Sequence, residues 1–196
     1  AVFSICTPFA APSKTFTRLE DAVASGVLKN FSYQLQLKGP DVEKNLQSAE
    51  KIRQFLNSAY GGQGPNGELG FTVSKGVVFD VLDKIGPTPL LSKEEIDYYL
   101  RGPLNWYRTR EINFEDEKVL AEKDAKLAMP AMFVTATKDA ALPPWMSQGM
   151  EEKFVNLSRG EVEATHWALW EAADSVNEQL GKWLQKVADG SFKASL

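Results

Sequence analysis

The sequence predicts an α/β fold in which parallel strands are covered by helices and a long, mainly helical segment is inserted. A short apolar run at Val2–Ile5 reads as a buried strand that enters a turn at Thr7-Pro8. A second apolar run, Ala131–Ala136, follows Pro130 without interruption, as in strands buried on both faces. After it, a helix, a strand and a further helix follow with short links, which is typical of a parallel sheet.

The composition suits a globular protein of one core, or a core with a lid. The chain has 196 residues, of which 43% are hydrophobic and 24% charged. Its net charge is −4, and the 26 acidic and 22 basic residues are interleaved, so no basic footprint for nucleic acid or for a membrane surface is expected. No apolar run reaches the length of a bilayer span, and no Cys/His cluster has metal-ligand spacing. A single cysteine and the lack of a signal peptide favour a reducing, cytoplasmic location, and we expect no cofactor.

The pattern divides the chain at residues 1–14, 15–125 and 126–196. The middle part is predicted to be mainly helical, because apolar residues recur at helical spacing from Val42 to Tyr60. A glycine-rich loop follows, and its G-x-G-x-x-G match is not a dinucleotide site, because a helical pattern precedes it where a strand is required. Ser92 and Glu95 form a capping-box pattern that predicts the start of another helix. The charged run 111–126 is interpreted as a solvated face or linker.

The last part is predicted to alternate between strands and helices. Pro143 and Pro144 suit the first turn of a helix that reaches about Phe154. Residues 159–164 are then expected to form a strand, and residues 176–187 an amphipathic helix.

Two titratable residues follow the predicted strands of the last part. Asp139 comes just after the strand 131–136, and His166, the one histidine in the chain, comes just after the strand 159–164. Ligands bind beyond the carboxyl ends of parallel strands, and there an acid can orient an imidazole as a general base. An ordinary loop histidine beside a solvated aspartate fits the spacing equally well.

The stretch RGPLNWYRTR, residues 101–110, resembles the lid motif of the α/β-hydrolase-fold epoxide hydrolases of the cytosolic type. Four further stretches match this family in order: SICTPF, FSYQLQLKGPDVEKNL, VTATKDAALPPWMSQGMEE and EVEATHWALWEAADSVNEQLGKWL. The resemblance implies the C-terminal part of an α/β-hydrolase fold with a helical lid. It places Tyr33 and Tyr107 at the two catalytic tyrosines, Asp139 at the acid and His166 at the base.

The resemblance also implies a two-step reaction that needs no cofactor. An aspartate opens the epoxide to form an alkyl-enzyme ester, while the two lid phenols donate to the leaving oxygen. The histidine then activates water, which hydrolyses the ester to a vicinal diol. The expected substrate is a small apolar epoxide, and four aromatic residues are candidates to line its channel: Phe9, Trp106, Trp145 and Trp167. Core packing is the favoured role for at least half of the tryptophans.

The family's aspartate elbow (H-D-W-G or a close relative) and its H-G-x-P loop have no counterpart in this sequence. We therefore expect the chain to be the C-terminal half of such an enzyme and to be inactive alone. The strand Val2–Ile5 is expected to leave an open sheet edge that the N-terminal half, or a second copy of the chain, occupies. Two alternatives remain: a non-catalytic fragment or ligand-binding module, and a related hydrolase such as a haloalkane dehalogenase. The tyrosine pair argues against the second of these.

Overall fold

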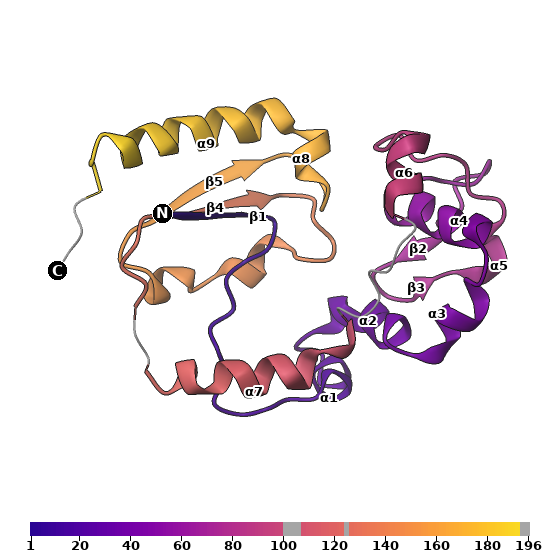
Figure 1. Cartoon of the computed structure of the whole chain (residues 1–196), viewed down its shortest axis with the longest axis horizontal. Coiled ribbons are helices and arrows are strands. Elements are labelled where there is room, and N and C mark those ends of the chain that lie inside the picture. Colours follow the sequence, from indigo (N-terminus) through magenta and orange to yellow (C-terminus); the bar gives the residue numbers. More distant parts are fainter. Residues whose placement is uncertain (100–106, 124–125, 193–196) are drawn as a thin grey trace. The chain divides into compact units, whose positions relative to one another are not determined.

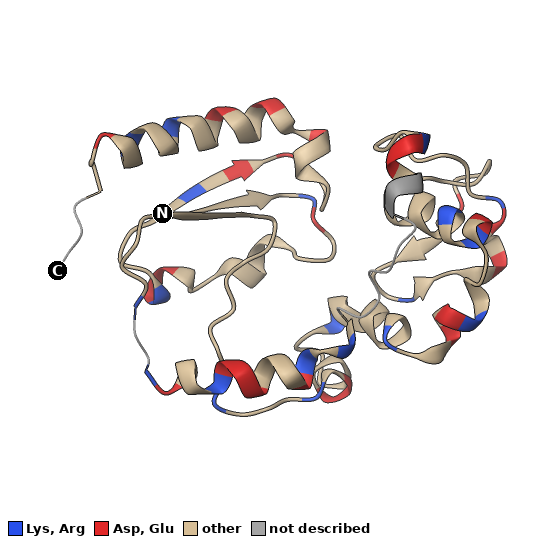
Figure 2. Ribbon diagram, in the orientation of Figure 1, with Lys and Arg blue, Asp and Glu red and all other residues tan. Residues whose placement is uncertain are grey.

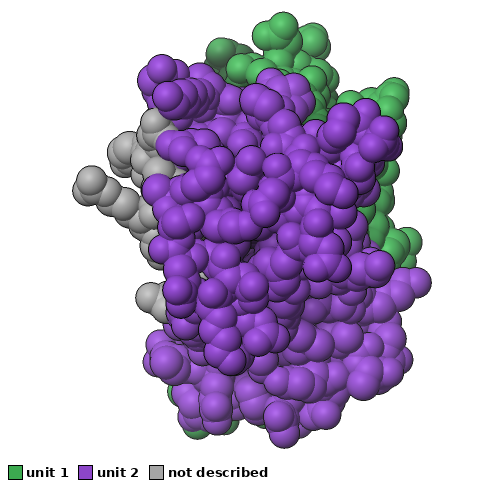
Figure 3. Space-filling view, turned by 90° about the vertical axis from the view of Figure 1, so that its right-hand side faces the viewer, with its two compact units in different colours: residues 1–14, 117–196 green, residues 15–116 purple. Residues whose placement is uncertain are grey.

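The computed structural model describes residues 1–99, 107–123 and 126–192. The chain forms two compact units (Figures 1 and 3). Unit 1 comprises residues 1–14 and 117–196, and unit 2 comprises residues 15–116.

Unit 1 is built on a parallel sheet of three strands within its described residues. The strands are β1 (Val2–Ile5), β4 (Ala131–Ala136) and β5 (Leu157–Val162), in the order β1-β4-β5. In the register, Val2 pairs with Ala131, which in turn pairs with Leu157. The predicted strands at Val2–Ile5 and Ala131–Ala136 are confirmed, but the first is not buried as predicted, because its residues are exposed or half-buried. The last strand begins and ends two residues before the predicted 159–164.

The central strand β4 is buried on both faces, as its unbroken apolar run predicts. Side chains alternate between the faces of a strand, so alternate residues of β4 enter two different clusters. On one side, Met132 and Val134 pack with Val176 and Trp183 of helix α9 (Ala173–Ala188). On the other side, residues 131 and 133 pack against a segment of short helices, with Met150 and Phe154. Figure 1 shows α9 and this segment on opposite faces of the sheet.

The segment after β4 is not the single helix that was predicted for residues 143–154. It consists of two 3-10 helices, η3 (Pro144–Ser147) and η4 (Met150–Lys153). Gln148 is extended, with φ −64° and ψ 138°, and Gly149 has a φ of 80°. A left-handed residue cannot continue a helix, so the sequence turns here and Met150 reaches the sheet.

Strand β1 lies at an edge of the sheet among the described residues. Val2 and Phe3 are 47% and 48% exposed, which is high for apolar side chains on a strand. Phe3 contacts the ring of Trp183 edge-on, with centroids 6.5 Å apart. An apolar edge strand of this kind is a ready template for pairing with further chain.

Unit 2 is mainly helical, with one small hairpin. Its elements are α1 (Leu19–Ala24), η1 (Lys29–Phe31), α2 (Ser32–Leu37), α3 (Pro40–Asn45), α4 (Ala49–Ala59), β2 (Phe71–Thr72), β3 (Gly76–Val77), α5 (Phe79–Leu82), α6 (Lys93–Tyr99) and α7 (Arg110–Ala121), whose last residues belong to unit 1. The charged run predicted as a solvated face or linker forms α7, and most of its side chains are exposed.

The helix predicted from Val42 to Tyr60 is in fact two helices, α3 and α4. Helix α3 ends at Asn45, because the next residue, Leu46, has a φ of −107° and a ψ of 52°, which are not helical. Ser48 then starts α4, because its hydroxyl accepts a hydrogen bond from the backbone N–H of Lys51 at 3.2 Å. The apolar spacing runs through this break because both helices bury residues in the same cluster, namely Val42 and Leu46, with Ile52 packed against it.

Two local predictions for unit 2 are confirmed. The backbone N–H of Ser92 donates to the Glu95 carboxylate at 2.7 Å, and the Ser92 hydroxyl accepts from the Glu95 N–H at 3.2 Å, which is a capping box at the start of α6. The glycine-rich segment 61–70 is a loop, as predicted, and it follows a helix rather than the strand that a dinucleotide motif requires.

Acidic and basic side chains are interspersed along the elements of both units (Figure 2). Among the described residues, none of the helices combines the length and the apolar character that crossing a bilayer requires.

Candidate active site

The loop after β4 holds Asp139 as a buried carboxylate. Asp139 is 3% exposed, and one of its oxygens, Oδ1, accepts hydrogen bonds from the backbone N–H groups of Ala141 and Leu142 at 2.9 and 2.8 Å. These bonds form an Asx-type turn, in which an aspartate bonds to backbone a few residues further on. The turn uses Oδ1 and leaves Oδ2 for another partner.

The loop after β5 is tied to the same edge of the sheet by backbone hydrogen bonds. The N–H of Thr137 donates to the carbonyl of Val162, and the N–H of Lys138 donates to the carbonyl of Ala164, both at 3.0 Å. Because β4 and β5 are parallel neighbours, their carboxyl ends lie side by side. The topology therefore brings the residues after Ala164 next to Asp139.

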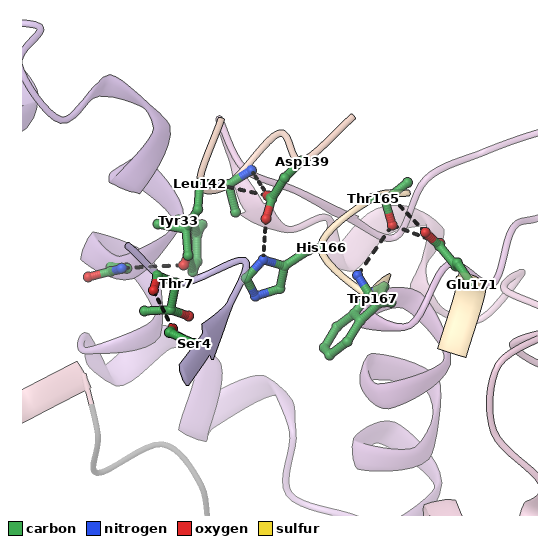
Figure 4. Close-up of polar contacts among 11 residues, drawn as sticks. Ser4, Thr7, Tyr33, Asp139, Leu142, Thr165, His166, Trp167 and Glu171 are labelled. Carbon is green, nitrogen blue, oxygen red and sulfur yellow. Dashed lines mark hydrogen bonds and ion pairs between the residues drawn. The ribbon is translucent and has the colours of Figure 1, made fainter. Parts of the chain in front are cut away.

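His166 and Asp139 form a direct hydrogen bond at this edge (Figure 4). His166 Nδ1 lies 2.8 Å from Asp139 Oδ2, and the His166 side chain is 39% exposed while that of Asp139 is 0% exposed. Burial alone would raise the pKa of the Asp139 carboxyl, but the hydrogen bonds from His166, Leu142 and Ala141 together lower it below its ordinary value. The pair thus combines a carboxylate that stays ionised with an imidazole whose Nε2 faces away from it.

Cys6 follows strand β1 in a tight turn, one residue before the turn predicted at Thr7-Pro8. Its φ is 61°, a left-handed value that is uncommon outside glycine, and the N–H of Thr7 donates to the carbonyl of Ile5 at 2.7 Å. The thiol is buried, and burial followed by the negative charge of Asp139 raises its pKa to about 11. Cys6 therefore lies close to the acid loop as an apolar, un-ionised neighbour.

Unit 2 brings together the two tyrosines that the resemblance singled out. The rings of Tyr33, on α2, and Tyr107 have centroids 6.2 Å apart and meet at 79°. Both pack beside a buried cluster formed by Leu37, Val42, Leu46, Val77 and Leu82. Burial, followed by the neighbouring Tyr33, raises the pKa of Tyr107 to about 12.

A side-chain amide fixes α2 against the hairpin β2–β3. Gln36 donates to the carbonyl of Val77 at 3.0 Å and accepts from the N–H of Val77 at 2.7 Å. One turn earlier, the N–H of Tyr33 donates to the carbonyl of Val73 at 3.2 Å, and its ring meets Phe71 edge-on with centroids 5.5 Å apart. The hairpin therefore positions Tyr33, and Gln36, which docks the helix on the hairpin, was not among the residues predicted from the sequence.

The four candidate substrate-binding residues lie in different settings. Trp167 is half-buried, and its ring meets that of His166 with centroids 5.4 Å apart. Phe9 packs edge-on against Phe154 at 5.2 Å. Trp145, on η3, is 47% exposed, and Trp106 lies outside the described residues. In residues 1–99, 107–123 and 126–192, no three His, Cys, Asp or Glu side chains gather where they could hold a metal ion.

The sequence is similar to those of known epoxide hydrolases. The chain is 39% identical to the epoxide hydrolase srdG of Neurospora crassa over 94% of its own length and 58% of that protein. It is 32% identical to the bifunctional epoxide hydrolase 2 of Mus musculus, again over 94% of its own length but 34% of that protein. The chain thus spans between about a third and three fifths of these curated relatives. No protein-family model matches it.

Solved structures share the fold. An epoxide hydrolase A from Mycobacterium thermoresistibile superposes with a TM-score of 0.63 at 24% identity, over 93% of this chain and 60% of that one. An epoxide hydrolase from Vigna radiata gives a TM-score of 0.64 at 19% identity, over 94% of this chain and 61% of that one. These likenesses show the fold alone, and the sequence relatives confirm the family that the motifs of the sequence indicated: the chain belongs to the α/β-hydrolase-fold epoxide hydrolases.

Proposed function

We propose that the complete protein converts an epoxide and water to a vicinal diol, and that this chain supplies the general base, its acid partner and two phenolic proton donors. The observation that carries the proposal is the 2.8 Å contact between His166 Nδ1 and Asp139 Oδ2 on loops from adjacent parallel strands. This contact fixes the Nδ1–H tautomer of the neutral ring, so that Nε2 is the atom able to take a proton.

In the first step, an aspartate outside these 196 residues attacks an epoxide carbon. A carbon–oxygen bond of the ester forms, the ring carbon–oxygen bond breaks, and the departing oxygen takes a proton from a phenol. Tyr33 and Tyr107 are suited to this role because their rings adjoin. The pKa of Tyr107, raised to about 12, keeps that phenol protonated at neutral pH, as an acid must be.

In the second step, His166 Nε2 takes a proton from water. The resulting hydroxide attacks the carbonyl of the ester, and the acyl–oxygen bond breaks. The departing oxygen takes the proton of the new carboxyl group, so that the diol leaves and the aspartate is restored as a carboxylate, and the imidazolium proton returns to the phenolate formed in the first step. Asp139 stabilises the imidazolium while it exists, and the lowered pKa of Asp139 keeps the carboxylate charged for that purpose. Neither step requires a metal or an organic cofactor.

We propose that the substrate is a small apolar epoxide. We propose further that its binding channel is lined by Phe9, Trp106, Trp145 and Trp167. Support comes from Trp167, whose ring contacts His166 directly. Trp145 and Phe9 are 47% and 37% exposed, so each has surface to offer a ligand. Aromatic faces supply large apolar contact areas of the kind that small-molecule pockets use.

We further propose that the N-terminal half of the protein, or a second copy of the chain, pairs with the edge strand β1. The support is the position of β1 at the edge of the described sheet, with Val2 and Phe3 about half exposed. The relatives are longer than this chain, and the proposed nucleophile must come from chain that these residues do not include. On this proposal, the chain alone is inactive.

Diol formation from styrene oxide tests the proposed reaction. We expect none from the chain alone, and turnover from the full-length protein or from the chain combined with the polypeptide that carries the aspartate elbow. In the active preparation, His166→Ala should stop turnover while the alkyl-enzyme ester accumulates, visible as an added mass of one substrate on the nucleophile-bearing segment. Turnover that survives His166→Ala would refute the proposed base.

A further inference from the structure

A carboxylate outside the acid–base pair binds the histidine loop from the other side. Glu171, the last residue of α8 (Ala168–Glu171), accepts two hydrogen bonds from Thr165. The Thr165 backbone N–H donates to Glu171 Oε2 at 2.6 Å, and the Thr165 hydroxyl donates to Glu171 Oε1 at 2.7 Å. Figure 4 shows the two dashed contacts between these residues, beside His166. Both carboxylate oxygens are thus used on one residue, in charge-assisted hydrogen bonds.

The contacts bracket the residue that carries the proposed base. Thr165 directly precedes His166, and Trp167 directly follows it. The Thr165 hydroxyl oxygen also accepts a long hydrogen bond, of 3.5 Å, from the backbone N–H of Trp167. Glu171 is itself held in place within helix α8. Its N–H donates to the carbonyl of Trp167 at 3.1 Å, and Ala168, at the start of the helix, is fully buried. The peptide of His166 is therefore held on both sides by groups that converge on Glu171.

The loop between β5 and α8 is short, and a further hydrogen bond holds it at its start, before Thr165. The carbonyl of Ala164 accepts from Lys138, which ties the start of the loop to the acid loop. From Thr165 to Trp167, the contacts with Glu171 and with the Thr165 hydroxyl take up the backbone donors on either side of the histidine. A shift of the His166 backbone here would move Nδ1 away from Asp139 Oδ2, because one side chain with two torsions joins them.

We propose that Glu171 is a positioning residue that acts through Thr165 to keep His166 Nδ1 on Asp139. This role differs from that of Asp139, which touches the imidazole and selects its tautomer. Supporting residues of this kind set the orientation of a catalytic group, and displacements of about 1 Å can lower rates by about a hundredfold. The inference rests on the proposed role of His166 as the base, but its consequence for the ring can be measured without any turnover.

The sole histidine makes the test direct. Ring ¹⁵N spectra of the uniformly labelled chain contain signals from one imidazole, and their shifts give the ratio of Nδ1–H to Nε2–H tautomers. The spectra are recorded at alkaline pH, where the ring shifts no longer change as pH is raised further, so that the neutral ring alone is compared between variants. We expect Glu171→Ala to lower the Nδ1–H to Nε2–H ratio about three- to tenfold, which is the loss that weakening one hydrogen bond produces.

Three further variants separate positioning from charge and from folding. Thr165→Val keeps the Glu171 charge but removes the hydroxyl, so a lowered ratio there cannot come from electrostatics, and Thr165→Ser should restore it. Glu178→Gln removes an exposed carboxylate from α9, where it pairs with Lys182, and should leave the ratio unchanged. The backbone amide spectrum of each variant reports whether it is folded.

An unchanged tautomer ratio in folded Glu171→Ala would overturn the proposal, even if that variant unfolded at a lower temperature, because Glu171 would then be a structural cap alone. Should Glu171→Ala fail to fold, Thr165→Val decides, and an unchanged ratio there overturns the proposal. Since no epoxide or nucleophile enters the measurement, its failure leaves the proposed hydrolysis standing. Failure of the hydrolysis would likewise leave this measurement valid.

Discussion

The acid–base pair of unit 1 and the phenol pair of unit 2 are held in place by opposite means. Asp139 is fixed by polar contacts, since both of its oxygens accept hydrogen bonds and its backbone follows a sheet strand. Tyr33 and Tyr107 are fixed mainly by packing, ring against ring and beside a cluster of buried aliphatic side chains. A polar site needs defined partners, whereas an aromatic pair needs a shaped apolar surface.

The same difference decides how burial affects ionisation. At Asp139, burial raises the pKa, but three hydrogen bonds more than offset it, so the carboxyl titrates below its ordinary range. At Tyr107, burial acts in concert with the nearby Tyr33, and the pKa rises to about 12. Each environment therefore stabilises the form that the proposed chemistry needs, a charged carboxylate in one unit and a neutral phenol in the other.

We expect the largest effect on activity from removal of the charge of Asp139. In the active, nucleophile-containing protein, Asp139→Asn should lower kcat for styrene oxide by about 10³- to 10⁴-fold, because an amide neither selects the productive tautomer nor stabilises the imidazolium. Steady-state diol formation measures the effect. Asp174→Asn, at an exposed carboxylate in the first turn of α9, is the matched control and should keep full activity. A similar kcat for Asp139→Asn and the parent would remove Asp139 from the mechanism.

Removing one phenol should have a smaller effect, because its neighbour remains. We expect Tyr107→Phe to lower kcat/KM for epoxides by about 10- to 100-fold, since general acid catalysis contributes about 10²–10⁴ in total and Tyr33 can still donate. The ring packing is kept in this variant, so the fold should persist. Tyr60→Phe alters a half-buried tyrosine at the end of α4 and serves as the comparison. Unchanged turnover in Tyr107→Phe would exclude Tyr107 as an acid.

The two regions also differ in how far the sequence could predict them. Asp139 and His166 follow strands that run in the same direction, so the order of the strands predicted that the two residues would lie close together. It could not distinguish a catalytic acid–base pair from a loop histidine beside a solvated aspartate. Tyr33 and Tyr107 are 74 residues apart, in helices and loops with no sheet register to relate them, and the family resemblance was needed to single them out. Their packing depends on the hairpin that Gln36 docks, which no periodicity reveals.

Local backbone chemistry explains the other differences. The spacing of Val42, Leu46 and Ile52 is helical across a break, because hydrophobic periodicity records which face is buried and not whether the chain is continuous. The break lies between the end of α3 at Asn45 and the Ser48 cap that begins α4, and the prediction of one helix did not include that cap. Gly149 divides the predicted helix after Pro143 by different means, through its left-handed φ of 80°. The hydrogen bonds between Glu171 and Thr165 could not be predicted from the sequence, because a glutamate in a short helix gives no indication of the partner of its carboxylate.

Acid unfolding gives the finest comparison of the two environments. The pKa of Asp139 is lower in the folded chain than the value of about 3.9 expected when unfolded, so its stabilising contribution is fully present above about pH 4 and is lost as pH falls through the folded pKa. The difference in urea unfolding free energy between the parent chain and Asp139→Asn should therefore shrink below about pH 4. The corresponding difference for Tyr107→Phe should stay constant there, because a phenol with a pKa of about 12 does not titrate in that range. A pH-independent difference for Asp139→Asn would mean that its hydrogen bonds do not outweigh its burial, and the contrast between the two sites would disappear.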